Sequence, residues 1–258
     1  MIDTHAHLYD ESFQGEIDLT IKEIKDSGVG QVWLPNCDSE TWPDLWNLYQ
    51  GNKEFLRPMV GLHPTYVKEN YQSELSFVEA TLQEFRPEIL AIGEIGLDYY
   101  WDTSFKNEQI EAFEIQSNWA MEHHLWIDIH CRKAYSDLIH ILSKSEFRQL
   151  FGICHCFSGD YREAHKLVDL GYYLGIGGVI TFKNTKLFDS IKDIPLNRIV
   201  LETDAPYLSP DPYRGKQNNP KYIPLIAHKL AELYKVDIEE IIETTNNNAS
   251  ILRNYSAY

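Results

Sequence analysis

Long apolar runs and basic residues are both scarce in this sequence. No stretch approaches the ~20 consecutive apolar residues that a membrane-spanning helix requires. The first residues also lack the charged and then apolar pattern of a secretion signal, which predicts a cytoplasmic protein without membrane contact. Lysine and arginine together number 23 against 39 aspartates and glutamates, so the formal net charge is −16. That balance disfavours a broad basic surface for nucleic acid, although a cleft that binds divalent cations can reverse the field locally.

Cysteine pairs and nucleotide-binding glycine motifs are also missing. The four cysteines, Cys37, Cys131, Cys154 and Cys156, form no CxxC pair, so we expect reduced thiols rather than a disulfide scaffold. Neither GxGxxG nor GxxxxGK follows the first apolar run, which leaves the nucleotide-binding forms of a doubly wound open sheet without support. An open sheet of this kind is therefore only the second interpretation of the fold.

Short apolar runs that alternate with segments of helical periodicity favour a barrel instead. We expect strands over residues 1–8, 31–37, 57–63, 89–96, 126–131, 152–157, 172–180 and 198–204. Amphipathic helices are expected between them, for example over 17–24, 75–85, 105–121 and 135–142. This alternation predicts an α/β fold, a (β/α)8 TIM barrel, as a single domain over 1–258. The proline- and asparagine-rich loop 207–224 then lies over the C-terminal rim, and 221–254 forms two packing helices.

Residues able to bind metal ions end five of the expected strands. They are His5 and His7 on the first strand, Glu94 on the fourth, His130 on the fifth, His155 on the sixth and Asp204 after the eighth. Side chains two apart on a strand share a face, so both imidazoles of the HxH motif face the same way. Strands one and eight are neighbours in a closed barrel, as are strands five and six, so each pair can hold one ion. Glu94 has two carboxylate oxygens and could bridge both ions.

Each member of this set has an ordinary explanation when it is taken alone, such as a core histidine or an aspartate that begins a loop. Together, at one end of one barrel, they predict a site for two divalent ions, with zinc, manganese and magnesium as the candidates. An ionised carboxylate in the apolar strand around Glu94 is costly unless it is paired or bound to metal. Two ions ~3.5–4 Å apart suit the hydrolysis of phosphate esters or amides.

Several segments of the chain resemble the TatD family of metal-dependent deoxyribonucleases, which belongs to the amidohydrolase-like TIM barrels. They are DTHAHL at 3–8, GLHP at 61–64, AIGEIGLDYY at 91–100, IHCR at 129–132, CHCFSG at 154–159, LETDAPYLSP at 201–210 and RGKQNNP at 214–220. These segments span almost the whole chain in the family's order and spacing. The resemblance implies two divalent ions, one held by His5, His7, Glu94 and Asp204 and the other by Glu94, His130 and His155. It also implies 3′–5′ hydrolysis of DNA, with single-stranded 3′ ends as substrate and no obligate protein partner.

Under this interpretation Asp204 orients the attacking water and accepts its proton, and Glu94 acts beside it as the second catalytic residue. Glu202 is expected to orient a metal ligand from behind. Candidates for contact with substrate are His63 at the end of the third strand, Arg132 after the fifth, and Arg214 and Lys216 in the rim loop. Surface salt bridges or solvated charges are the ordinary explanation for the three cationic residues.

Two features of the sequence bear on the alternatives. No lysine lies within 89–101, where many dinuclear amidohydrolases carry a carboxylated lysine, so amidohydrolases of that kind are disfavoured. Family members often have Arg-Asn-Glu-Pro where this chain has Gln217, Asn218, Asn219 and Pro220, so neutral amides replace a cation and an acid near the substrate. A small-molecule phosphoester, amide or lactone hydrolase of the same fold is the alternative function. A catalytically silent interaction protein is disfavoured because all six ligand residues are present.

Overall fold

Parallel strands in the computed structural model, which describes residues 1–256, form two sheets that join into a closed barrel. One sheet has the order β1–β2–β3 and the other β4–β5–β6–β7–β8. The strands are β1 (Ile2–Asp3), β2 (Gln31–Leu34), β3 (Leu56–Pro58), β4 (Ala91–Asp98), β5 (Trp126–Arg132), β6 (Gly152–Cys154), β7 (Tyr173–Ile176) and β8 (Ile199–Leu201). Parallel bridges between Ala6 and Ala205 and between Val60 and Ile92 close the two seams between the sheets.

The seam between the first and last strands is reinforced by one buried carboxylate. Oδ1 of Asp3 accepts a hydrogen bond from the backbone N–H of Thr203 at 3.0 Å, and Oδ2 accepts from the Thr203 hydroxyl at 2.5 Å. These two residues lie 200 positions apart in the sequence. Burial raises the pKa of Asp3 to about 7, although its hydrogen bonds with Thr203 and the N–H of His5 favour the ionised form. This seam fixes the residues that follow β1 against those that follow β8.

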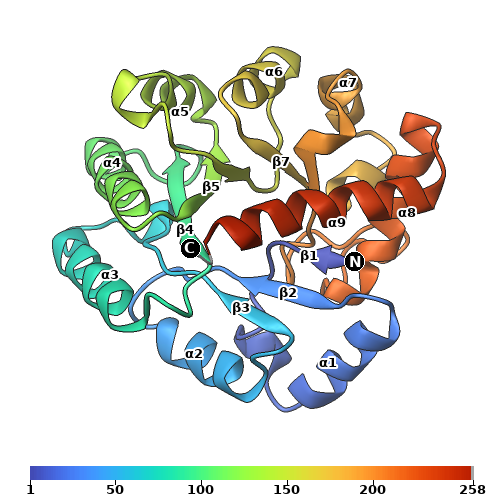
Figure 1. Ribbon diagram of the computed structural model, residues 1–258, viewed down its shortest axis with the longest axis horizontal. Coiled ribbons are helices and arrows are strands. Elements are labelled where there is room, and N and C mark those ends of the chain that lie inside the picture. The colour runs from blue at the N-terminus through green and yellow to red at the C-terminus, as the bar shows by residue number, and fades with distance from the viewer. Residues whose placement is uncertain (257–258) are drawn as a thin grey trace.

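Helices surround the strands on the outside of the barrel (Figure 1). They are α1 (Ile17–Asp26), α2 (Trp42–Gly51), α3 (Tyr71–Phe85), α4 (Lys106–Glu122), α5 (Tyr135–Leu142), α6 (Tyr161–Asp169), α7 (Leu187–Ile191), α8 (Ile223–Tyr234) and α9 (Ile238–Tyr255). Their apolar faces are buried against the sheet, as Leu45, Leu82 and Phe113 illustrate. The arrangement confirms the predicted α/β barrel, and α8 and α9 are the two helices expected after the rim loop.

Helix α9 crosses the end of the barrel at which the strands begin (Figure 1). Its buried residues Ala249 and Leu252 belong to one hydrophobic cluster with the strand residues Trp33, Trp126 and Val200 and with Met59, which follows β3. Asn248, on the same helix, donates from its side-chain amide to the carbonyls of Leu196 and Ile199 at 2.9 and 2.7 Å. An apolar layer therefore closes this end, and the polar side chains gather at the opposite end.

Several strands are shorter than the sequence predicts. The segment expected as a strand over 1–8 is regular only within β1, because Thr4 and His7 donate their backbone N–H groups to carbonyls at and beyond the end of β8. The strand expected over 172–180 ends with β7, since Gly178–Thr181 forms a 3₁₀ helix. Irregular backbone thus replaces strand at the C-terminal ends, where it positions side chains for the site.

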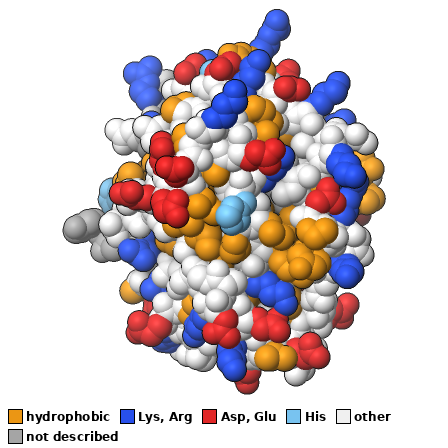
Figure 2. All heavy atoms as spheres, turned by 90° about the vertical axis from the view of Figure 1, so that its right-hand side faces the viewer, with side chains coloured by type: hydrophobic (Ala, Val, Ile, Leu, Met, Phe, Trp, Pro, Cys, Tyr) orange, Lys and Arg blue, Asp and Glu red, His pale blue; other side chains and the backbone are white. Residues whose placement is uncertain are grey.

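The outer surface shown in Figure 2 carries charges of both signs. This view faces the flank where α1 and α8 lie in Figure 1, and acidic and basic side chains are interspersed on it. This flank therefore offers no broad basic surface, as the charge balance of the sequence predicts. Within residues 1–256, no helix has the length and apolar character needed to cross a membrane.

Candidate metal centre

The six predicted ligand residues lie in one cluster at the C-terminal ends of the strands, together with His63. The cluster contains three overlapping groups of three residues, and within each group the potential ligand atoms lie within 4.8 Å of one another. These groups are His5, His155 and Asp204; His5, His7 and Glu94; and His63, Glu94 and His130. Residues far apart in the sequence are thus brought into one polar centre inside the barrel mouth.

Glu94 lies at the middle of this cluster and is almost fully buried. Its oxygen Oε2 lies 3.2 Å from Nε2 of His5 and 3.5 Å from Nε2 of His7. Its other oxygen faces a second set of rings: Oε1 lies 2.8 Å from Nε2 of His155, 2.9 Å from Nδ1 of His130 and 3.1 Å from Nε2 of His63. One carboxylate therefore separates two groups of imidazole nitrogens, with one oxygen directed at each.

An irregularity in β4 gives Glu94 this position. The register between β4 and β5 shifts between Ile92 and Ile95, so β4 contains one extra residue there. Such a bulge re-aims a side chain. The loop after β2 supports it, because the N–H of Asn36 donates to the carbonyl of Gly93 at 3.1 Å and the N–H of Glu94 donates to the carbonyl of Asn36 at 2.9 Å.

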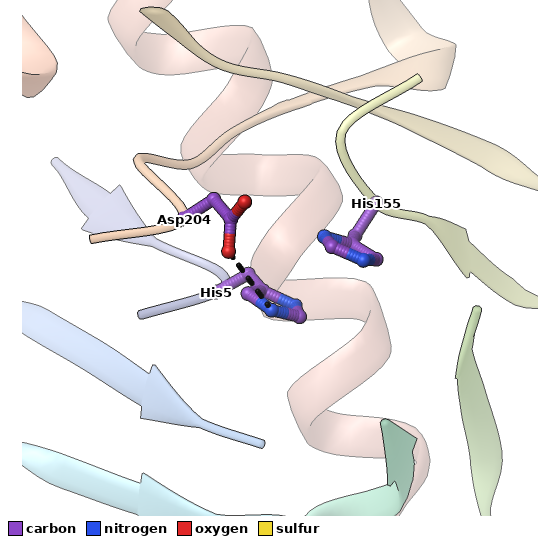
Figure 3. Close-up of side chains that lie close together, drawn as sticks. All are labelled: His5, His155 and Asp204. Atoms are coloured by element: carbon purple, nitrogen blue, oxygen red, sulfur yellow. Dashed lines mark ion pairs between the residues drawn. The ribbon is translucent and has the colours of Figure 1, made fainter. Parts of the chain in front are cut away.

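His5, His155 and Asp204 lie in the segments that follow β1, β6 and β8, and their side chains meet in Figure 3. Oδ1 of Asp204 lies 3.7 Å from Nε2 of His5 and 3.6 Å from Nε2 of His7. The rings of His5 and His155 stack, with centroids 3.8 Å apart and planes inclined by 4°. The Asp204 side chain is 15% exposed, whereas that of Glu94 is 3% exposed. Asp204 and His130, whose side chain is 18% exposed, are therefore the members of the cluster to which water has most access.

Ring nitrogens that point away from the cluster are held by three further side chains. Oδ2 of Asp128 lies 2.7 Å from Nδ1 of His5, the Tyr9 hydroxyl 2.8 Å from Nδ1 of His7, and Oδ2 of Asp98 2.9 Å from Nε2 of His130. The Tyr9 hydroxyl also donates to the carbonyl of Pro35 at 2.6 Å, so it accepts from His7. Partners of this kind fix the orientation of a metal-binding imidazole and raise its basicity.

The sequence interpretation misses Asp128, Asp98 and Tyr9, although one of them has a clear signal. Asp128 lies two residues before His130 on β5, so strand alternation places both side chains on the interior face. A buried acid on that face needs a partner, and His5 provides it. The positions of Asp98 and Tyr9 depend on contacts across the barrel that no spacing in the sequence indicates.

Glu202 lies near His155, the ligand it is predicted to orient, but the two side chains form no hydrogen bond. Its oxygen Oε1 accepts from the N–H of Cys156 at 2.5 Å and lies 3.9 Å from Nδ1 of His155. A Cβ at Gly175 would overlap the Glu202 carboxyl, so any side chain at this position would displace that carboxyl. Burial raises the pKa of Glu202 well above its ordinary value, and the nearby Asp204 adds to the shift.

Electrostatic coupling sets the protonation of the central residues. Burial acts to raise the pKa of Glu94, but the charges of His155, His63 and His5 hold it well below its ordinary value. Burial acts to lower the pKa of His130, but hydrogen bonds with Asp98 and Glu94 raise it to about 9. The carboxylates therefore attract positive charge, as protons on the rings or as metal ions.

The pKa values of His7 and Asp204 follow the same logic. Burial acts to lower the pKa of His7, yet the neighbouring Cys37 and the hydrogen bond with Asp204 raise it to about 10. Burial acts to raise the pKa of Asp204, yet that hydrogen bond and the histidine charges lower it. Asp204 is therefore ionised at neutral pH and able to accept a proton.

The predicted substrate residues occupy different places. His63 is within the cluster, and its Nδ1 accepts from the N–H of Thr65 at 3.1 Å, so its Nε2 carries the proton. The Arg132 guanidinium lies 3.7 Å above the centre of the Tyr100 ring, at the end of β5. Arg214 and Lys216 are exposed in the rim loop and are not among the clustered side chains.

The amides that replace the usual charges of the family have local roles. Gln217 donates from its side chain to the carbonyl of Ser12 at 3.0 Å, which ties the rim loop to the segment after β1. Oδ1 of Asn219 accepts from the N–H of Lys221 at 3.0 Å and caps a short 3₁₀ helix. Both side chains stabilise the loop from outside the cluster.

Comparison with known proteins gives a consistent result. The model of the family described as TatD related DNase matches residues 2–254. The metal-dependent hydrolase YabD of Bacillus subtilis is 35% identical over 254 residues, which cover 98% of each chain. The metal-dependent hydrolase YcfH of Escherichia coli is 35% identical over 256 residues, covering 96% of this chain and 93% of that protein. The crystal structure of YjjV, a TatD homologue from Escherichia coli, superposes with a TM-score of 0.92 at 29% identity and 98% coverage of both chains.

Proposed function

This chain belongs to the TatD family of metal-dependent hydrolases, and from that premise we propose that it is a deoxyribonuclease that removes nucleotides from the 3′ end of DNA. The observation that carries the proposal is the position of Glu94, with one carboxylate oxygen toward His5 and His7 and the other toward His130 and His155. A bridging carboxylate between two sets of nitrogen ligands suits a centre of two divalent ions, which is typical of phosphodiester hydrolysis.

The donor set fits divalent ions. His5, His7, Glu94 and Asp204 would hold one ion, and Glu94, His130 and His155 would hold the other. Imidazole nitrogens mixed with carboxylate oxygens suit zinc or manganese, and magnesium is the third candidate. Bound ions supply activation of a water nucleophile and positive charge against the transition state.

The surrounding side chains have distinct tasks in the proposed reaction. Asp204, ionised and accessible to water, orients the attacking water and accepts its proton. His63 is a neutral ring with a proton on Nε2, which it can donate to a phosphate oxygen rather than bind metal with that atom. Arg132, Arg214 and Lys216 supply positive charge for the backbone of the substrate around the rim.

The test is hydrolysis of a DNA oligonucleotide with a 3′ overhang by metal-stripped protein, with and without added Mn²⁺ or Mg²⁺. We expect metal-dependent loss of nucleotides from the 3′ end, and at least a 100-fold lower rate for Glu94→Ala, because that variant removes the bridging ligand. Glu84→Ala, which changes an exposed acid on α3, is the matched control and should behave like the parent protein. Intact DNA in the presence of protein that binds two ions per chain would refute the deoxyribonuclease and favour a small-molecule hydrolase.

A further inference from the structure

Two exposed aromatic side chains lie at the rim directly beyond β4. Tyr100 is 51% exposed and Trp101 is 70% exposed, so neither belongs to the core. Their ring centroids are 4.9 Å apart and their planes are inclined by 86°. The guanidinium carbon of Arg132 lies 3.7 Å from the centre of the Tyr100 ring and 5.3 Å from that of Trp101. We call these three side chains the rim platform.

One carboxylate connects the rim platform to the candidate metal centre. Oδ1 of Asp98 accepts from the N–H of Tyr100 at 2.8 Å, while Oδ2 lies 2.9 Å from Nε2 of His130. Asp98 is also paired with Arg132 in the register of β4 and β5. Arg132 follows His130 by two residues on the same strand, so both side chains leave the same face. The platform is therefore continuous with the half of the cluster that contains His130.

The positive charge of Arg132 in the rim platform is available to bind an anion. Nearby, Lys68 is paired with Asp102 at 3.3 Å and Lys106 with Asp137 at 2.7 Å. Within residues 1–256, Arg132 forms no ion pair and instead stacks on aromatic faces. A guanidinium stacked by its face keeps its N–H edge available for phosphate oxygens.

We propose that Tyr100, Trp101 and Arg132 bind the unpaired terminal bases of a nucleic-acid strand by stacking, next to the bond that is cut. This inference rests on the proposed function and assigns its strand-end specificity to these residues. Aromatic faces stack on every base, so the platform accepts any sequence. Paired bases are already stacked in a duplex, so the platform selects unpaired ends.

The test separates binding from hydrolysis. Binding of 5′-labelled dT8 to the metal-stripped protein is measured by fluorescence anisotropy in the presence of chelator. Trp101→Ala should weaken binding about 5- to 150-fold, the range that corresponds to the loss of one stacked base. Trp101→Phe should restore most of the affinity because it retains an aromatic face. Tyr161→Ala is the matched control, since Tyr161 is 43% exposed and packs on His165 rather than on the platform.

A second oligonucleotide with abasic residues at its three 3′-terminal positions identifies the contact. It should bind the parent protein as weakly as dT8 binds Trp101→Ala, and the substitution should not weaken it further. The platform would be overturned if Trp101→Ala and the parent protein bound dT8 with equal affinity. It would also be overturned if the substitution reduced the affinity for dT8 and for the abasic oligonucleotide by the same factor. DNA cleavage by the metal-loaded protein with unchanged binding by the variant refutes only the platform. Platform-dependent binding without cleavage refutes only the deoxyribonuclease.

Discussion

Replacement of Asp128 by asparagine should weaken metal binding without disturbing the barrel. Asp128 is fully buried on β5, and its Oδ2 lies 2.7 Å from Nδ1 of His5. Asparagine has nearly the same shape and can still accept the hydrogen bond from His5. The substitution therefore removes the negative charge that makes Nε2 of His5 a stronger donor and leaves the geometry in place.

The expected magnitude follows from that role. Loss of a partner that orients a ligating histidine costs about 10- to 100-fold in metal affinity or activity. This range corresponds to ~1.4–2.8 kcal/mol, since each factor of ten is ~1.4 kcal/mol. Only one of the predicted ligands is affected, so the second half of the cluster should still bind metal with nearly its original affinity.

The assay is titration of metal-stripped protein with Mn²⁺ against a chromophoric chelator, which gives both dissociation constants. Asp137→Asn is the matched control, because Asp137 binds Tyr99 and Lys106 at the rim and contacts no ligand histidine. A dissociation constant within twofold of the parent value for Asp128→Asn would refute the reasoning. It would mean that the charge behind His5 does not reach the metal centre.

Three further predictions concern stability and pH. Leu252→Ala, in the buried layer that closes the barrel, should lower the free energy of unfolding by ~2–5 kcal/mol and Tm by roughly 4–20 °C. In the same thermal denaturation experiment, Ile251→Ala should have nearly the Tm of the parent protein because Ile251 is exposed. Chelation of the metal should lower Tm by about 5–11 °C for each ion that had been present at 100 times its Kd, and calorimetry with no such shift would contradict a bound ion. Metal affinity should rise from pH 6 to 8, by up to tenfold per pH unit for each proton that the metal displaces. The pKa values of about 10 for His7 and about 9 for His130 mean that both rings must lose a proton before they bind metal. Isothermal titrations that give the same metal affinity across this pH range would exclude the prediction.

The fold could be predicted from the sequence because each strand of the barrel is a separate apolar run with a helix after it. The positions of the candidate ligands along the chain also indicate one end of the barrel, and the structure does bring these side chains together. Their detailed arrangement could not be predicted. The extra residue in β4 that directs Glu94 inward arises from pairing with β5 and support from Asn36, which are contacts between distant segments. The contact between Asp98 and His130 likewise exists only once β4 and β5 are paired.

The seam between Asp3 and Thr203 has a consequence for the timing of synthesis. Translation delivers Asp3 200 residues before its partner, and His5 and His7 likewise precede Asp204 by almost the whole barrel. A ribosome-bound chain that has not reached β8 therefore has an unpaired β1 edge and lacks Asp204, one of the six predicted ligands. We therefore expect a nascent chain at this stage to be inactive, since Asp204 joins the candidate site only when the last strand joins the first. Unpaired edges also invite association with other chains, so this stage is when the protein most needs protection from aggregation.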